Sequence, residues 1–143
     1  MSESTGNENE LPLVRRARTY GDRTAVLSGN RAFSYADLLQ ASEDVARKLL
    51  GTGPGDLREE RIAFLIPGSF EYVAVQWGVW RAGGIAVPLS VAAKEPELEH
   101  VLTDAAVSRV IVSASLQERI ESLTRRLGIE RTTVEEILPG GTG

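Results

Sequence analysis

Apolar and polar positions along the first part of the chain predict a β-hairpin followed by an amphipathic helix. Two apolar runs, Ala25–Leu27 and Ala32–Tyr35, flank "SGN", whose glycine and asparagine tolerate positive φ. The helix is predicted to begin after Ser34, which has the spacing of a capping box with Asp37, and to end at Gly51. Its apolar side chains recur on one face at helical spacing: Leu38, Leu39, Val45, Ala46, Leu49 and Leu50.

The second part of the chain alternates continuous apolar runs with helical patterns. Runs such as "RIAFLIP", "IAVPLS" and "RVIVS" lack polar alternation, which is typical of strands that are buried on both faces of a sheet. The helical segments between them match the crossovers that parallel strands require. The predicted fold class is therefore α/β, a parallel sheet with crossover helices, preceded by the short hairpin. The predicted strands are Arg61–Ile66, Ile85–Leu89 and Arg109–Val112.

Two of the crossover helices carry clear end signals. The segment Ser69–Ala82 begins with a capping serine and is apolar on almost every side, so we expect it to lie between the sheet and another layer. The last helix, in "LQERIESLTRRLG", is predicted to begin at a capping box of Ser115 and Glu118 and to end at Gly128. These signals concern folding rather than chemistry.

Composition places the chain among ordinary folded proteins. It has 143 residues, of which 42% are hydrophobic and 25% charged, enough for one domain with a real core. The net charge is −4, and the basic cluster of Arg15, Arg16 and Arg18 is interpreted as a solvated helix face, so no nucleic-acid partner is expected. The chain has no cysteine, which excludes disulfides, thiolate metal sites and cysteine nucleophiles.

The sequence also bears on location. No stretch approaches the roughly 20 apolar residues of a membrane-spanning helix, so no membrane span is expected. The opening "MSESTGNENE" has neither the basic and apolar regions of a secretory signal nor the character of a transit peptide. The expected location is cytoplasmic.

Candidate functional residues are few. We predict no catalytic and no metal-binding residue, because His100 falls on a solvated helix face and no grouping has metal-ligand spacing. Gly68 and Ser69 are weak cofactor-binding candidates, since amide donors at a strand-to-helix junction can hold an anion, although simple capping by Ser69 is favoured. Trp77 and Trp80 share a helix face, where core packing is favoured over the lining of a ligand cavity.

One glycine-rich stretch, at 51–56, has the composition of a phosphate-binding loop. This stretch, "GTGPGD", follows a helix rather than a strand, which favours a plain loop over a phosphate site.

Four segments of the chain resemble, in order and spacing, the N-terminal part of the AMP-forming acyl-CoA synthetases, in the adenylate-forming superfamily. They are "GDRTAVL", "FSYADLL", "RIAFLIPGSFEYVAVQWGVWRAGGIAVPLS" and "ELEHVLTDAAVSRVIV". The resemblance covers Leu11–Ser113, and "RAGGIAVPL" with "ELEHVL" is its most specific portion. "PGDLREERIAFL" and "VAVQWGVW" are most similar to malonyl-CoA and methylmalonyl-CoA synthetases.

The resemblance implies that a full-length protein activates a small carboxylate with ATP and Mg²⁺ and transfers the acyl group to CoA. The family's Ser/Thr/Gly loop ending in Pro-Lys-Gly, its later nucleotide motifs, its hinge and its C-terminal lysine have no matching position here. No catalytic residue is therefore carried over, and no cofactor is expected in this chain itself. The matching stretch is expected to be scaffold.

Accordingly the chain is expected to be a fragment. The expected organisation is a disordered tail at 1–10, a partial N-terminal domain of an AMP-binding enzyme at 11–138, and a loose end at 139–143. An incomplete domain leaves apolar surface uncovered, so self-association is also expected. The alternative interpretation is a non-catalytic α/β module that binds a nucleotide or a partner protein, with Pro67–Ser69 and Leu89–Val91 as the binding region.

Overall fold

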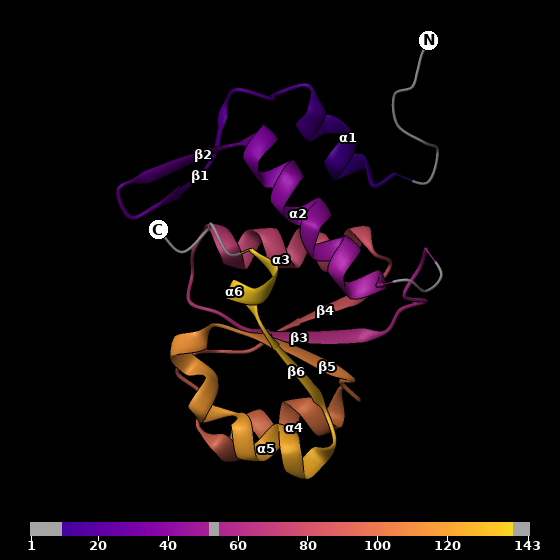
Figure 1. The fold of residues 1–143 in the computed structure, drawn as a ribbon, viewed down its shortest axis with the longest axis vertical. Helices are drawn as coiled ribbons and strands as arrows, with labels where there is room; N and C mark the ends of the chain where they lie inside the picture. Colours follow the sequence, from indigo (N-terminus) through magenta and orange to yellow (C-terminus); the bar gives the residue numbers. More distant parts are fainter. Residues whose placement is uncertain (1–9, 52–54, 139–143) are drawn as a thin grey trace.

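A computed structural model describes residues 10–51 and 55–138 (Figure 1). The predicted tail at 1–10, apart from Glu10, and the predicted loose end at 139–143 lie outside the described residues, as does part of the "GTGPGD" loop. The elements are α1 (Pro12–Arg18), β1 (Thr24–Ser28), β2 (Arg31–Ser34), α2 (Tyr35–Leu50), β3 (Arg61–Leu65), α3 (Phe70–Arg81), β4 (Ile85–Pro88), α4 (Glu95–Asp104), β5 (Arg109–Val112), the 3-10 helix η1 (Ala114–Arg119), α5 (Glu121–Leu127), β6 (Glu130–Thr133) and α6 (Val134–Ile137).

The sheet confirms the predicted α/β class. Its strand order is β4-β3-β5-β6, and every neighbouring pair is parallel. The three predicted strands are all present, and β3 lies between the other two. A fourth strand, β6, was not predicted, because "ERTT" has no apolar run. It pairs along the outer edge of β5, with Ile111 opposite Thr132, and carries mostly half-exposed side chains.

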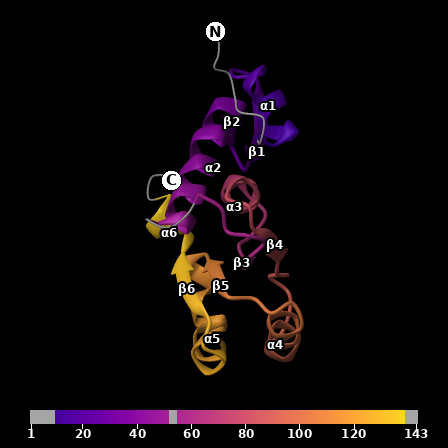
Figure 2. The same ribbon diagram turned by 90° about the vertical axis from the view of Figure 1, so that its right-hand side faces the viewer.

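The sheet is buried on both faces, as its apolar strands predict. Along β3, Ile62 and Phe64 pack with helices α2 and α3, whereas Ala63 and Leu65 pack with α4 and α5. Figure 2 shows this arrangement from the side, with α2 and α3 on one side of the sheet and α4 and α5 on the other. Alternate side chains of a strand point to opposite faces, so a strand covered on both sides has no polar position.

Helix α3 lies between the sheet and α2, which explains why its sequence is apolar on almost every side. Ala74 and Val75 are fully buried, and Trp77 is only 8% exposed. The close approach of the two helices requires a glycine at position 78, since a Cβ atom there would lie 2.4 Å from the Cβ and Cγ1 atoms of Val45. The α2–α3 contact is therefore set by the absence of one side chain.

The N-terminal hairpin and helix form as predicted. Strands β1 and β2 are antiparallel, and the turn between them has a positive φ at Gly29 (+64°). Ser34 and Asp37 form a reciprocal capping box, in which the Asp37 N–H donates to Ser34 Oγ (3.0 Å) and the Ser34 N–H donates to Asp37 Oδ2 (2.9 Å). Tyr35 begins α2 instead of ending β2, and Gly51 ends it with a positive φ.

The prediction of one helix with a Ser115–Glu118 capping box is wrong. The segment splits into η1 and α5 at Ile120, and neither helix has a side-chain cap. Tertiary contacts explain the split, because the Ala114 N–H donates to the Glu135 carboxylate (3.0 Å) and the Arg119 guanidinium donates to backbone carbonyls of the loop after β4. These contacts hold the first turn tightly wound, which local sequence signals do not report. The predicted end at Gly128 is confirmed, with φ +72°.

Candidate functional site

The carboxyl ends of β3 and β5 form the switch point of the sheet. These neighbouring strands lead to helices on opposite faces, since α3 packs with α2 whereas η1 and α5 lie on the side of α4. The two loops therefore diverge as they leave the sheet. In open parallel sheets, ligands bind in the crevice at such a point. This is the place where sequence reasoning put Gly68, Ser69 and the Pro67–Ser69 binding region.

A hollow of about 380 Å³ lies at this switch point. The β3–α3 loop, the end of β5, the start of α6 and the hairpin turn all contribute to its wall. Its lining residues are Ser28, Gly29, Arg31, Ile66, Pro67, Ser69, Glu71, Ser113, Val134 and Glu135. Sequence reasoning found the loop after β3 but not the contribution of the hairpin or of α6, since neither is adjacent in sequence to β3.

Ser69 lines the hollow and Gly68 does not. The Ser69 hydroxyl donates to the Pro67 carbonyl oxygen (2.9 Å) and accepts from the Tyr72 N–H (3.2 Å). It thereby caps α3, the alternative that the sequence favours. Gly68 is exposed, its φ lies outside the positive region, and a Cβ atom there would meet nothing within 4 Å. Neither backbone conformation nor crowding requires a glycine at 68, and binding of a cofactor by Gly68 or Ser69 stays a prediction.

The charges around the hollow do not suit a triphosphate. Two carboxylates, Glu71 and Glu135, and one guanidinium, Arg31, belong to its lining. Glu71 Oε2 is buried, and none of the described residues donates a hydrogen bond to it. Glu135 Oε1 accepts from the Ala114 N–H (3.0 Å). Carboxylates repel phosphate oxygens, so these residues do not fit ATP, and no chemical step is assigned to them.

The second predicted binding segment, Leu89–Val91, serves mainly to anchor the chain. Leu89 is buried in the core between the sheet and α4, and Val91 is 41% exposed. The Arg119 guanidinium donates to the carbonyl oxygens of Val91 and Ala93. This segment therefore ties the end of β4 to η1, and it does not line the hollow at the switch point.

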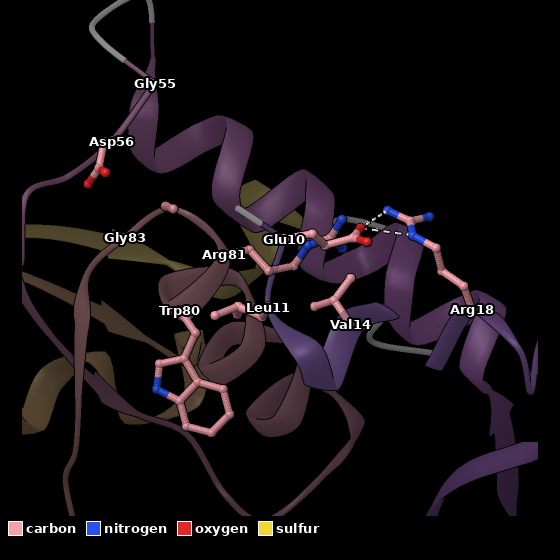
Figure 3. Close-up of a pocket in the computed structure, with 10 residues that line it drawn as sticks. Glu10, Leu11, Val14, Arg18, Gly55, Asp56, Trp80, Arg81 and Gly83 are labelled. Carbon is pink, nitrogen blue, oxygen red and sulfur yellow. Dashed lines mark hydrogen bonds and ion pairs between the residues drawn. The ribbon is translucent and has the colours of Figure 1, made fainter. Parts of the chain in front are cut away.

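A larger hollow, of about 620 Å³, lies near the amino ends of β3 and β4 (Figure 3). It is lined by Glu10, Leu11, Val14, Arg18, Gly55, Asp56, Trp80, Arg81, Ala82 and Gly83. The two tryptophans thus separate, because Trp77 belongs to the core whereas Trp80 is 37% exposed and borders this hollow. Sequence reasoning missed Glu10 and Arg81 as lining residues. The one available signal was a charged residue, Arg81, at the end of an otherwise mostly apolar helix.

Other predicted positions have structural or solvent-facing roles. His100 is exposed on α4, as predicted. Within residues 10–51 and 55–138, no group of three or more His, Asp or Glu side chains has the geometry of a metal site. None of the helices in the described part of the chain combines the length and apolar character that a membrane crossing needs.

Comparison with family models identifies one family. The model for "AMP-binding enzyme" matches residues 13–139, which include every strand and helix described above except the first residue of α1. The match is longer than the Leu11–Ser113 stretch on which the sequence resemblance was recognised, and it extends through η1, α5, β6 and α6.

Curated relatives carry names of acyl-CoA ligases. The mitochondrial malonate–CoA ligase of Mus musculus is 36% identical over 125 residues, covering 85% of this chain and 21% of the relative. The corresponding Homo sapiens protein is 35% identical over 127 residues, covering 86% of this chain and 22% of the relative. A feruloyl-CoA synthase from an Amycolatopsis species is 35% identical over 112 residues, covering 77% of this chain and 22% of the relative. The chain thus spans about a fifth of the length of the relatives that it matches.

Solved structures share the fold. Apo MatB from Rhodopseudomonas palustris has a TM-score of 0.74 and 24% identity, over 90% of this chain and 28% of that chain. An anthranilate CoA ligase in complex with anthranoyl-AMP has a TM-score of 0.75 and 24% identity, over 85% of this chain and 24% of that chain. At this level of identity the similarity establishes the arrangement of helices and strands alone.

Proposed function

Because the chain belongs to the AMP-binding enzyme family, we propose that it forms the N-terminal scaffold of an acyl-CoA ligase. The observation that carries this proposal is the 36% identity to a malonate–CoA ligase over 85% of the chain. The absence of a triphosphate-compatible charge pattern at the described switch point agrees with a supporting role for this portion. We propose the organisation of a partial N-terminal domain at 11–138, flanked by a tail at 1–10 and a loose end at 139–143.

The proposed reaction of the full-length enzyme has two steps. A carboxylate oxygen attacks the α-phosphorus of ATP, bound with Mg²⁺, and the bond to the β-phosphate oxygen breaks to release pyrophosphate. The CoA sulfur, having lost its proton, then attacks the acyl carbonyl carbon and releases AMP. None of the described residues takes part in either step. Their contribution is a buried sheet and the α2–α3 layer, on which the rest of such an enzyme would be built.

The proposed substrate is a small dicarboxylate, malonate or methylmalonate. Its support is that relatives from four animal species and one from Arabidopsis thaliana are named malonate–CoA ligases. A feruloyl-CoA synthase reaches 35% identity, close to the 36% of the malonate relative, so identity alone discriminates little between the two substrates. The proposed location is cytoplasmic. No observation favours the alternative of a non-catalytic binding module.

The test uses the longest open reading frame that contains this sequence. Its product, incubated with ATP, Mg²⁺ and CoA, is expected to release AMP faster with malonate or methylmalonate than with acetate, ferulate or a long-chain fatty acid. Release of AMP with none of these acids would overturn the proposal of an acyl-CoA ligase. Faster release with ferulate or a fatty acid would overturn only the dicarboxylate assignment.

A further inference from the structure

The hollow of about 620 Å³ combines an exposed aromatic ring with a guanidinium edge and a buried carboxylate oxygen that have no partner among residues 10–51 and 55–138. It lies between α1 and the C-terminal end of α3, and Figure 3 shows Arg81, Glu10 and Trp80 around it. Its volume of about 620 Å³ is within the range of small-molecule sites. The chemistry of these three groups defines what it would bind.

Within the described part of the chain, no acceptor contacts the carboxylate-binding edge of Arg81. Its Nη1 donates to the Leu39 carbonyl oxygen (2.8 Å) and to Ser42 Oγ (2.9 Å), which fixes the orientation of the guanidinium. None of the described residues accepts a hydrogen bond from its Nε or Nη2, and none forms an ion pair with it. Those two nitrogens form the side of the guanidinium that binds a carboxylate through two parallel hydrogen bonds. Burial, followed by the positive charge of Arg18, lowers the pKa of Arg81, so an added anion would be stabilising.

Glu10 supplies the complementary acceptor. Its Oε2 accepts two hydrogen bonds from Arg18, from Nε at 2.8 Å and from Nη2 at 2.5 Å, so the carboxylate is held in place. The Glu10 side chain is only 11% exposed. Its Oε1 is buried, and none of the described residues donates to it. A buried carboxylate oxygen without a donor is costly, and an ammonium group would satisfy it with a charge-assisted hydrogen bond.

Trp80 provides the apolar part of the hollow. The residue is 37% exposed, which is unusual for an aromatic residue on a helix whose other apolar positions are mostly buried. Leu11 and Val14 of the α1 segment also line the hollow (Figure 3). A ring or branched aliphatic group placed there would bury part of the indole face.

From these three groups we propose that the hollow binds a free α-amino acid with an apolar side chain. The carboxylate of the amino acid pairs with Nε and Nη2 of Arg81, its ammonium group donates to Glu10 Oε1, and its side chain packs on Trp80. The hollow lies at the amino ends of the strands, and this proposal does not depend on the reaction proposed for the full-length enzyme.

The test measures binding of three related compounds to the ¹⁵N-labelled chain. L-Phenylalanine carries both charges, 3-phenylpropanoate lacks the ammonium group, and 2-phenylethylamine lacks the carboxylate. The two indole N–H signals are assigned with the variant Trp80→Phe. We expect L-phenylalanine to shift the Trp80 signal saturably with a midpoint near or below about 1 mM, and each analogue to bind about tenfold or more weakly. The Trp77 signal, from the core, should move much less.

Two variants separate the ammonium contact from general effects. Glu10→Gln should weaken L-phenylalanine about tenfold and should not weaken 3-phenylpropanoate, since the second compound has no ammonium group to lose and is repelled by the Glu10 charge. Glu121→Gln, on an exposed glutamate of α5 across the sheet, is the matched control and should change neither affinity. No shift of the Trp80 signal at 10-fold excess over that midpoint would overturn the proposal. Equal binding of 3-phenylpropanoate and L-phenylalanine would overturn it too, because the hollow would then be an anion site only.

Discussion

The variant Gly78→Ala tests the packing of α2 against α3 most sharply. Alanine has the higher helix propensity, so in an exposed helix this change would stabilise the protein by about 1 kcal/mol. At position 78, however, the new Cβ would lie 2.4 Å from Val45 Cβ and Cγ1 and 3.0 Å from the Ser42 carbonyl oxygen, whereas ordinary contact begins at 3.4 Å. The gain in helix propensity and the steric clash have opposite effects on stability, and the short distances indicate that the clash is the larger effect.

The expected net loss in the free energy of unfolding depends on whether Val45 can move away from the new methyl group. Val45 Cβ is bonded directly to the backbone of α2, so no side-chain rotation removes the clash, and the two helices must separate by about 1 Å. Such a gap forfeits a quarter to a half of the dispersion energy of the atoms concerned, and overpacking of this kind costs about 1–3 kcal/mol. The upper end of this range, about 3 kcal/mol, applies because Val45 Cβ is bonded to the backbone and the Ser42 carbonyl oxygen belongs to it. After the gain in propensity, the free energy of unfolding should fall by about 2 kcal/mol.

Urea unfolding followed by circular dichroism at 25 °C measures this difference. The matched control is Gly68→Ala, since a Cβ atom there meets nothing within 4 Å and φ is not positive. That change should be neutral, or stabilising by up to about 1 kcal/mol through the unfolded chain. If Gly78→Ala proves as stable as Gly68→Ala to within about 0.5 kcal/mol, the described α2–α3 contact is wrong.

Three further predictions concern the core, the response to pH and the surface. Trp77→Ala should lower the free energy of unfolding by about 3–5 kcal/mol, because the ring is 8% exposed, and a loss below about 1 kcal/mol in urea titration would place it outside the core. Hydrogen bonds from Arg109, the largest cause, and from Ser108 lower the pKa of Glu60 below its ordinary 4.5, so its stabilising contribution is present above that value and is lost as the pH falls through the folded-state pKa. Urea titrations at several pH values should therefore show a smaller loss on acidification in Glu60→Gln than in the unmodified chain, and equal losses would refute the coupling. Light scattering at rising concentration should show self-association, and a constant monomer mass would favour a self-sufficient module.

The parallel sheet could be predicted because its signals are local. Strands β3 and β5 are covered on both faces, so their apolar runs contain no polar position and are recognisable in sequence. Strand β6 lies at the edge of the sheet, and its Arg131 side chain donates to Gln117 and Thr124 instead of packing in the core. A polar edge strand of four residues has no pattern that distinguishes it from a loop.

The contrast between local signals and contacts distant in sequence also explains which features of the candidate sites could be predicted. The capping role of Ser69 depends on residues two and three positions away, so it follows from sequence. The hollow near α1 depends on Glu10 and Arg81, which are far apart in the chain and meet only after α1 packs beside the end of α3. The η1–α5 break has a similar origin, since Glu135 and Arg119 hold it through contacts distant in sequence.

Pyrophosphate exchange tests most directly our proposal that this chain supplies scaffold and no reacting group. The chain is incubated with ATP, Mg²⁺, malonate and labelled pyrophosphate, beside a heat-treated sample and the product of the longer reading frame. Loss of a single preorganised donor costs about 10²–10³ in rate, and the lining of the switch-point hollow includes two carboxylates beside one guanidinium. We predict exchange by the longer product and none above the heat-treated sample for the chain alone. Exchange by the chain alone that is abolished by Ser69→Ala would contradict the proposal and place a working site at the switch point.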